Sequence, residues 1–401
     1  MRKAIAAVML AILVLGATAC GRPSGEGSDG LKTVKVGLIG ARSGASAALG
    51  QYLDAAVAAF RHMNETGGLG GYRFEVELRD DETNPTKAAE LTRELIYKEQ
   101  VVAIIGPTNT SNAVVMVPIV TEARVPLIVP VATGTQIVEN SFAEAKGDPS
   151  WVFSVTVTDD VQAERMARYA KEHGLTRPAI LHDDTAYGND GAQQLTKALA
   201  AVGITPVAVI SHNMSSPDLT PFVLKAREAG ADSLMLWSLG HDQAQAAKAR
   251  AKLGWDVPLI GCTSLQTSNF RSLAGPAAEG GLSIWPKGHV RINPNSNAVP
   301  PRIQQAYDIY FKYYGGDAKT IPLDTWGSGA FVYDAAMIVA QAVAAVGPDR
   351  EKIRDYIETQ PLTNLASRDE IRFSREKHTV YTADDLTMVI VQDGKLVELD
   401  D

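Results

Sequence analysis

Residues 101–106, VVAIIG, and residues 126–131, PLIVPV, are two short apolar runs that decide the fold class. Apolar residues stand at consecutive positions in both runs, which is typical of parallel strands buried by helices on both faces. Similar runs alternate along the chain with segments of helical periodicity, for example residues 85–98 and 160–173. The pattern predicts a doubly wound α/β fold built on parallel sheets.

The expected strands before Gly281 share a composition of β-branched and aliphatic residues. They cover residues 34–39, 74–78, 101–105, 126–131, 151–157, 179–182, 207–211, 233–237 and 258–260. Because so many βα units exceed what one open sheet normally holds, we expect two sheets and therefore two lobes. After Gly281 we expect one more strand (LSIWP), helices at 301–313 and 331–346, and a C-terminal hairpin with an Asp393-Gly394 turn.

The first twenty residues read as an export signal that ends on a cysteine. Arg2 and Lys3 precede an apolar stretch and a small-residue cleavage zone, so residues 1–19 are predicted to be a signal peptide. A membrane-spanning helix is the alternative, but about 16 apolar or small residues fall short of the ~20 that a span needs. Cys20 resembles the acylated cysteine of bacterial lipoproteins, and residues 20–33 form a Gly/Ser/Pro-rich tether. We therefore expect an extracytoplasmic protein anchored to the membrane through lipid on Cys20.

Charge and cysteine content exclude several classes of partner and bond. Removal of residues 1–19 takes the formal net charge from −8 to −10, and an acidic exported domain argues against nucleic acid as a partner. With Cys20 lipidated, Cys262 is the remaining thiol, so no intramolecular disulfide is expected. Cys262 is expected to be a buried small hydrophobe.

Catalytic and metal-binding signatures are missing from the sequence. The glycines at 37, 40 and 44 do not match GxGxxG, and the chain has no GxxxxGK[ST], GxSxG or HExxH. Residues 80–84 superficially suggest a calcium loop, but Pro85 stands where glycine is needed, and a helix cap is the expected role. His182 and the two aspartates after it lack a second ligand cluster. We expect no enzyme activity, no metal and no cofactor.

Hydroxyl residues gather where two expected strands end. Residues 106–112, GPTNTSN, and residues 132–135, ATGT, each lead into an expected helix. The unpaired N–H groups and the positive end of a helix dipole bind carboxylates there, and open α/β sheets bind ligands at this edge. Two such turns are able to hold one anion, although each taken singly also fits an ordinary N-cap.

Several stretches resemble the bacterial solute-binding proteins of the leucine/isoleucine/valine-binding type, which have the periplasmic binding protein type I fold. The resemblance runs from about Val34 to Leu399 and rests on VKVGLIGARSG, VVAIIGPTNTSN, VPLIVPVATGT, AILHDDTAYGNDG and PLIGCTSL. It implies two lobes joined by three crossing strands, with lobe 1 at 34–153 and 286–362 and lobe 2 at 154–285 and 363–401. It also implies a monomeric binding subunit of an ABC importer, which works with a permease and an ATPase.

The resemblance also implies ligand residues. Position by position, the first-lobe residues fall on Thr110, Val131, Ala132 and Thr133, where the threonines and nearby N–H groups would hold a carboxylate. From the second lobe, Tyr187 matches a tyrosine that closes over the ligand; a core aromatic is its alternative.

Other positions depart from the amino-acid binders of the family. The acid that pairs with an α-ammonium falls on Thr263, and a buried ammonium without a carboxylate costs several kcal/mol. Tyrosines of the family fall on Leu49 and near Leu239, with Trp237 close by, so we expect a more apolar pocket.

Two charged residues are candidates for the pocket: Asp242 to replace the missing acid, and Arg42 to add a charge. Asp242 and Arg42 are able to serve in these roles, although both are more typical of exposed loops. The family's small disulfide is absent, because Thr83 and Asn109 stand at its two positions. Residues 140–149 are expected to form a surface loop.

The sequence thus predicts the solute-binding subunit of an importer of the hydrophobic amino-acid family, which holds a small carboxylate between closing lobes. A ligand without an amino group, such as an aromatic or aliphatic acid or an amide, is the alternative, with an importer or a sensory role. A hydrolase on the same scaffold is disfavoured by the missing nucleophile motifs.

Overall fold

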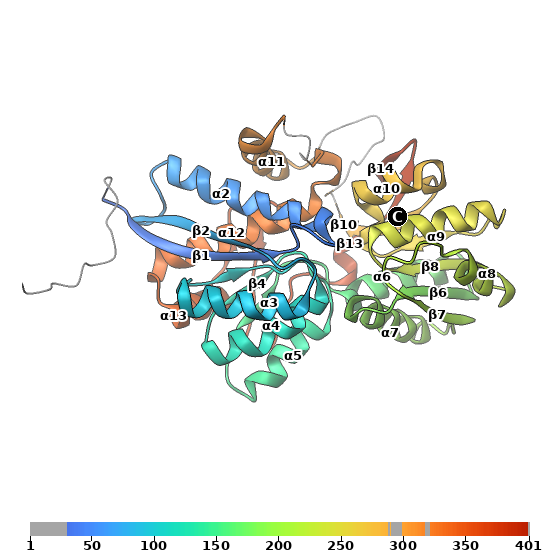
Figure 1. Ribbon diagram of the computed structural model, residues 1–401, viewed down its shortest axis with the longest axis horizontal. Coiled ribbons are helices and arrows are strands. Elements are labelled where there is room, and N and C mark those ends of the chain that lie inside the picture. The colour runs from blue at the N-terminus through green and yellow to red at the C-terminus, as the bar shows by residue number, and fades with distance from the viewer. Residues whose placement is uncertain (1–29, 288, 290–298, 317–320, 400–401) are drawn as a thin grey trace, which may run out of the picture.

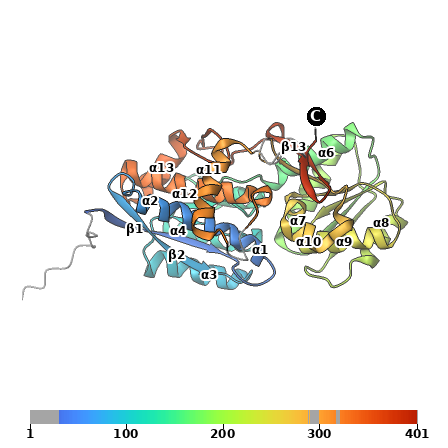
Figure 2. The same cartoon turned by 90° about the horizontal axis from the view of Figure 1, so that it is seen from above.

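The computed structural model describes residues 30–287, 289, 299–316 and 321–399. The predicted signal peptide, Cys20 and most of the 20–33 tether lie outside the described residues. Strand β1 (Lys32–Gly40) begins two residues before the first expected strand. The described chain forms two lobes that lie side by side (Figures 1 and 2).

The first lobe is built on a five-stranded sheet in the order β2-β1-β3-β4-β5, and all its strand pairs are parallel. Its other strands are β2 (Tyr72–Asp80), β3 (Ile104–Ile105), β4 (Leu127–Val129) and β5 (Val152–Ser154). Helices α2 (Asp54–Glu65) and α12 (Gly327–Val346) lie on one side of this sheet, and α3 (Pro85–Arg93), α4 (Thr110–Ala123) and α5 (Gln136–Ala145) lie on the other (Figure 1). The two apolar runs quoted first are the central strands β3 and β4, and their residues are buried.

The second lobe has a seven-stranded sheet in the order β14-β13-β10-β9-β8-β6-β7. Its strands are β6 (Pro178–Asp183), β7 (Ala208–His212), β8 (Ser233–Trp237), β9 (Leu259–Gly261), β10 (Leu282–Pro286), β13 (Leu386–Gln392) and β14 (Lys395–Glu398). Strands β6 to β10 are parallel, whereas β13 runs antiparallel to both β10 and β14. The sheet is therefore mixed, because the expected C-terminal hairpin joins its edge through the Asp393-Gly394 turn.

Helices cover both faces of the second sheet, as the residues of β8 demonstrate. Met235 and Trp237 share a buried cluster with residues of α6 (Asp159–Glu172) and α7 (Ala186–Ala201). The alternate residues Leu234 and Leu236 join the core that includes α8 (Thr220–Glu228) and α9 (Gly240–Lys252). Because successive residues of a strand point to opposite faces, the continuous apolar run of β8 is explained by this double cover.

The chain passes between the lobes after β5, after β10 and before β13. Helices α11 (Pro301–Tyr314), α12 and α13 (Arg350–Thr359) return to the first lobe, where α12 packs between α2, α11 and α13. Helix α12 is apolar and long enough to cross a membrane by composition alone, but most of it is buried inside the protein.

The predicted limits of the lobes stay predictions. The β11–β12 pair (Leu362–Thr363, Glu370–Ile371) follows α13. His378, which those limits assign to the second lobe, stacks on Phe153 of β5 with 4.1 Å between the ring centroids.

Two local expectations have clear outcomes. The cap predicted before Pro85 is confirmed, because the Asn84 side chain accepts hydrogen bonds from the N–H groups of Thr86 and Lys87. The surface loop expected at 140–149 is confirmed only for residues 146–148, which form an exposed turn; before them α5 continues to Ala145 and buries Ser141, whose hydroxyl lies 2.6 Å from that of Ser150. Helix α3 continues into a π-helical turn at Glu94–Lys98. Other short helices are α1 (Ala47–Gly50), α10 (Ser268–Ala274) and 3-10 turns at Gln51–Leu53, Thr263–Gln266, Gly275–Ala278, Leu323–Thr325 and Ala383–Asp385.

Candidate ligand-binding site

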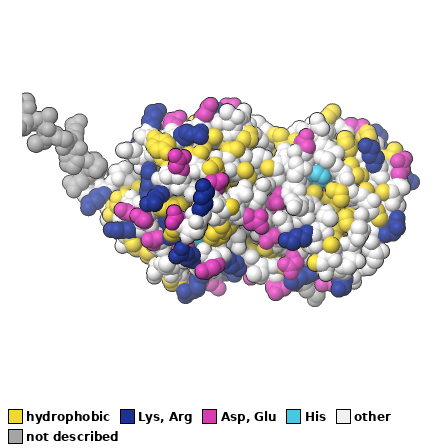
Figure 3. Space-filling view, turned by 90° about the horizontal axis from the view of Figure 1, so that it is seen from below, with side chains coloured by type: hydrophobic (Ala, Val, Ile, Leu, Met, Phe, Trp, Pro, Cys, Tyr) yellow, Lys and Arg dark blue, Asp and Glu magenta, His cyan; other side chains and the backbone are white. Residues whose placement is uncertain are grey.

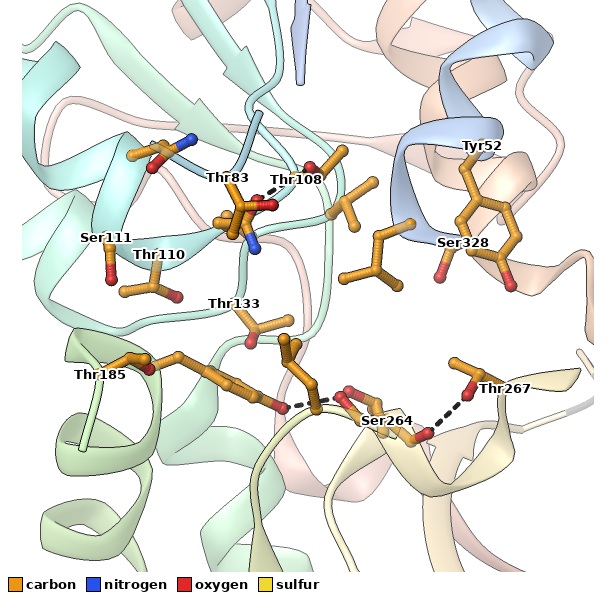
Figure 4. Close-up of a pocket in the computed structure, with 18 of the residues that line it drawn as sticks. Tyr52, Thr83, Thr108, Thr110, Ser111, Thr133, Thr185, Ser264, Thr267 and Ser328 are labelled. Carbon is orange, nitrogen blue, oxygen red and sulfur yellow. Dashed lines mark hydrogen bonds between the residues drawn. The ribbon is translucent and has the colours of Figure 1, made fainter. Parts of the chain in front are cut away.

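A cavity of about 250 Å³ lies between the two lobes. Its first-lobe wall begins where β3 and β4 end, and its second-lobe wall begins where β6 and β9 end (Figure 4). This is the edge at which parallel sheets present helix N-termini and therefore bind ligands. Of the predicted ligand residues, all except Trp237 line this cavity: Leu49, Thr110, Val131, Ala132, Thr133, Tyr187, Leu239 and Thr263.

The lining is uncharged. Most of the lining residues carry a hydroxyl or amide group, and among the described residues that line the cavity none is Asp, Glu, Lys, Arg or His. On the outer surface, by contrast, acidic and basic side chains are interspersed over both lobes (Figure 3). The expectation of a pocket more apolar than the family's amino-acid sites stays a prediction: apolar atoms supply the larger part of the lining surface, and its polar part comes largely from hydroxyl groups. They are Thr83, Thr108, Ser111, Thr185, Ser264, Thr267, Thr325 and Ser328, beside Thr110, Thr133 and Thr263.

Thr110 and Thr133 join the two hydroxyl-rich turns of the first lobe. Thr110 opens α4, and its Oγ1 accepts a hydrogen bond of 3.1 Å from the N–H of Gly134. A Cβ at Gly134 would lie 2.3 Å from the methyl group of Thr110, so this close approach requires glycine. Neither α4 nor α5 has a side-chain cap from its own N-cap residue, so the N-cap alternative for Thr110 is not what the structure has. The hydroxyl of Thr110 keeps its proton available for an acceptor in the cavity.

The starts of α4 and α5 are not equally available to a ligand anion. The N–H of Thr135, at the start of α5, donates to Asp190 Oδ2 over 2.7 Å. The first turn of α5 is therefore already occupied by a carboxylate of the protein. A ligand anion is left with the start of α4 and the hydroxyl of Thr133.

Tyr187 covers the cavity from the first turn of α7. Its side chain is 9% exposed, and its hydroxyl lies 2.9 Å from Cys262 Sγ and 3.2 Å from Ser264 Oγ. Burial raises the pKa of Tyr187 well above its usual value, so the phenol stays neutral and its ring adds apolar area to the wall. Cys262 is buried as expected, and burial raises the pKa of its thiol to about 11.

Trp237 is a core residue and not part of the cavity wall, which corrects its prediction. Its indole is fully buried at the end of β8, and its ring packs edge-on toward Tyr187 at 6.5 Å between centroids. A Cβ at Gly191 would lie 2.0 Å from the indole Nε1, so α7 passes directly over the ring. Trp237 therefore supports Tyr187 from behind.

Neither Asp242 nor Arg42, the two charged residues considered for the pocket, lines the cavity. Asp242 was expected on an exposed loop, but it is 1% exposed and accepts hydrogen bonds from Ser215 N and His241 Nδ1, both at 3.0 Å. The guanidinium of Arg42 pairs with Asp54 at 2.7 Å, away from the lining. The neutral Thr263 position thus has no replacement acid among these candidates.

A buried acid does lie behind the first-lobe turn. Asp159, the first residue of α6, hydrogen-bonds the Thr133 side chain, and its Oδ2 is buried with no hydrogen-bond partner among the described residues. Burial raises the pKa of this carboxyl well above its usual value, which favours the neutral acid. Asp159 is not part of the cavity lining.

Sequence reasoning missed several lining residues. Tyr52 lies one helical step after Leu49 and supplies a tyrosine to this wall, where its hydroxyl donates to the carbonyl of Thr325 over 2.8 Å. The spacing of three residues was the signal that could have found it. Trp285 and Ser328 come from β10 and α12, far away in sequence, and no local pattern marks them.

The positions of the missing disulfide hold a hydrogen-bonded bridge. Thr83 Oγ1 accepts from the N–H of Ser46 at 3.1 Å, and the Asn109 amide donates to the hydroxyl of the same serine. Ser46 is buried, so it joins the two loops at the mouth of the first-lobe wall without a covalent bond.

Comparison with known proteins identifies the family. A family model described as a periplasmic binding protein matches residues 33–395, and the chain belongs to this family. The chain is similar to the leucine-, isoleucine-, valine-, threonine- and alanine-binding protein of Pseudomonas aeruginosa, with 23% identity over 87% of this chain and 89% of that protein.

Solved structures agree on the fold. A type 1 periplasmic binding protein from Bordetella pertussis Tohama I has a TM-score of 0.81 and 25% identity, and the match covers 92% of this chain and all of that one. A solute-binding protein of an ABC transporter from Rhodopseudomonas palustris, solved with 4-hydroxybenzoate, has a TM-score of 0.75 and 24% identity over 92% of this chain and 96% of that one. The two-lobed α/β fold expected from the sequence is thereby confirmed.

Proposed function

We propose that this chain is the extracytoplasmic solute-binding subunit of an ABC importer and that it binds a small carboxylate in the cavity between its lobes. The observation that carries the proposal is the uncharged, hydroxyl-rich lining at the N-terminus of α4. Such a site holds an anion by hydrogen bonds and the helix dipole, without a neutralising cation. Catalysis is not part of the proposal, because the mechanism is binding and closure.

The ligand residues proposed are Thr110 and Thr133 for the carboxylate and Tyr187 for the cover. Val131, Ala132, Leu49 and Leu239 would contact the apolar body of the ligand, and Thr263 would face it without charge. Because none of the described lining residues carries a carboxylate, an α-amino group would be left without an ionic partner, and this favours a ligand that lacks one. The likeness to a chain solved with 4-hydroxybenzoate supports this class of acid.

An amino acid is the second candidate, and Asp159 is the observation that favours it. A ligand ammonium close to Thr133 would stabilise the ionised form of this buried carboxyl. The likeness to a protein named for leucine, isoleucine and valine binding points the same way.

The partners follow from the proposed role. A permease with its ATPase would recognise the closed pair of lobes, and lipid on Cys20 would hold the monomer at the membrane where they lie.

A thermal-shift screen of the chain from residue 25 onward, refolded from denaturant to strip bound ligand, tests the proposal. The compounds are matched pairs: L-leucine with 4-methyl-2-oxopentanoate, and L-tyrosine with 4-hydroxybenzoate. We expect the acids without an amino group to raise the melting temperature. A rise for the amino acids alone would overturn this ligand class and assign Asp159 as the ammonium partner, and no rise for any carboxylate would overturn the carboxylate site.

A further inference from the structure

Helix α5 in the first lobe has its N-terminal cap in the second lobe. Thr135, its N-cap residue, makes no side-chain cap and has helical backbone angles of φ −57° and ψ −39°. Its N–H instead donates to Asp190 Oδ2 at 2.7 Å, and the N–H of Gln136 donates to the same carboxylate. Asp190 belongs to α7, which starts at the cavity with Tyr187.

The Asp190 carboxylate is held firmly for this contact. It is 7% exposed, and its second oxygen, Oδ1, accepts from the Gln194 side chain at 3.3 Å, one turn further along α7. The Gln136 side-chain amide donates in the same direction, from α5 to α7, to the carbonyl of Ala186 at 3.2 Å. The start of α5 therefore donates hydrogen bonds to the first turns of α7, from its backbone and from a side chain, across the boundary between the lobes.

The same turn lies against the cavity. Thr133 lines it, Gly134 is fixed by Thr110, and Thr135 follows directly with its N–H toward Asp190. A ligand that orders Thr133 therefore also presents the N–H groups of Thr135 and Gln136 to the second lobe. Binding and closure favour each other when one short turn makes both contacts.

We propose that Asp190 is a positioning residue that caps α5 from the opposite lobe and so stabilises the closed form around the ligand-binding turn. The proposal rests on the proposed function, because it assumes a ligand at Thr133. An ionised carboxylate at a helix N-terminus gains both charge-assisted hydrogen bonds and the dipole interaction. When the lobes separate, the carboxylate and the N–H groups return to water and this gain is lost.

The experiment measures the distance between the lobes by pulsed EPR. Spin labels are placed at the exposed positions Glu90 on α3 and Lys248 on α9, with Cys20→Ala as background. Asp190→Ala removes the cap, and Asp190→Asn keeps an acceptor oxygen but removes the charge. Asp349→Ala is the matched control, because Asp349 caps α13 within its own lobe by accepting from Lys352 N at 3.0 Å. Distances are recorded without ligand and with 4-hydroxybenzoate or L-leucine.

We expect Asp190→Ala to lower the ratio of closed to open molecules about tenfold, Asp190→Asn to lower it less, and Asp349→Ala to leave it unchanged. With a bound probe, release should quicken by the same factor. A distribution in Asp190→Ala equal to that of the wild type would overturn the proposal, and so would a wild type that shows no closed population in any condition. When the wild type shows a closed population without ligand, failure of both probes to bind would count against the proposed ligand class alone, because the ligand-free comparison still decides the role of Asp190. Circular dichroism verifies that each variant is folded.

Discussion

The two walls of the cavity are built in different ways. The first-lobe wall comes from two adjacent parallel strands and the turns that follow them, so Thr110, Gly134 and Thr133 lie within one short network. The second-lobe wall takes Tyr187, Leu239 and the Thr263–Gln266 turn from three separate βα connections, and its shape depends on the Trp237 core behind it. The comparison suggests that the first wall fixes the group that every ligand shares, while the second wall selects the ligand body.

The strongest way to break the second wall is Gly191→Ala. The new Cβ would lie 2.0 Å from the Trp237 indole, so we expect a loss of about 3 kcal/mol in the free energy of unfolding, despite the better helix propensity of alanine. Denaturant unfolding measures it, with Gln193→Ala on the exposed side of the same helix as the control. Wild-type stability would mean that the indole is free to move and that this wall is adaptable.

The first wall is broken by Thr110→Val, which keeps the shape but removes the hydroxyl. The N–H of Gly134 loses its acceptor and the proposed carboxylate loses a donor, so we expect binding about thirtyfold weaker, which is about 2 kcal/mol. Calorimetry with the best compound of the thermal-shift screen measures the change. Thr196→Val, whose hydroxyl bonds only the carbonyl of Ala192, is the control. Equal affinity in both variants would remove Thr110 from the site.

Thr263→Glu tests whether the second-lobe wall selects the ligand. A carboxylate at this position gives an α-ammonium its ionic partner, so the ratio of L-leucine to 4-methyl-2-oxopentanoate affinity should rise about tenfold. The neutral Thr263→Gln variant separates charge from size. If both variants shift the ratio equally, the second wall selects by shape and not by charge.

The smallest expected effect concerns pH and the helix behind the first wall. Burial raises the pKa of Asp334, on α12, to about 7, while its oxygens accept from the N–H groups of Ala366 and Ser367. A carboxyl that binds its proton more tightly when folded makes the protein more stable as the pH falls from about 7 toward 4. His289, which bonds the Ser367 carbonyl, acts in the opposite sense, because burial lowers its pKa to about 4.

The measurement is therefore the difference in the free energy of unfolding between the wild type and Asp334→Asn. The stability of the wild type relative to Asp334→Asn should grow by about 1 kcal/mol between pH 8 and pH 6, as thermal melts at several pH values report. The histidine contribution is common to both proteins and cancels. A constant difference would mean that Asp334 is ionised throughout this range.

The sequence was informative where function depends on local pattern. The continuous apolar runs predicted the buried parallel strands, and the hydroxyl-rich turns after them predicted Thr110 and Thr133 on the cavity wall. Tyr52 was missed, although its spacing from Leu49 on a helical stretch carried the signal.

The other residues that were mispredicted or missed depend on tertiary structure. Whether Trp237 faces a cavity or a core is decided by which face of β8 its side chain takes and by the passage of α7 over it, and neither is local. Asp242 was expected at the surface because loops of the kind that carries it are usually exposed, yet the Ser215 N–H donates to its carboxylate and the side chain is buried. Ser328 reaches the cavity because the chain returns to the first lobe after β10, and Trp285 reaches it from the end of β10 itself.

The bridge at Ser46 has a consequence for how this protein folds. Where a thiol pair would have to be oxidised, the loops of Thr83 and Asn109 are joined by a hydroxyl group that needs no electron acceptor and no disulfide catalyst. Cys262 is buried in the other lobe, so the protein should reach the same structure under reducing and oxidising conditions. Its folding is thereby uncoupled from the redox chemistry of the compartment in which it works.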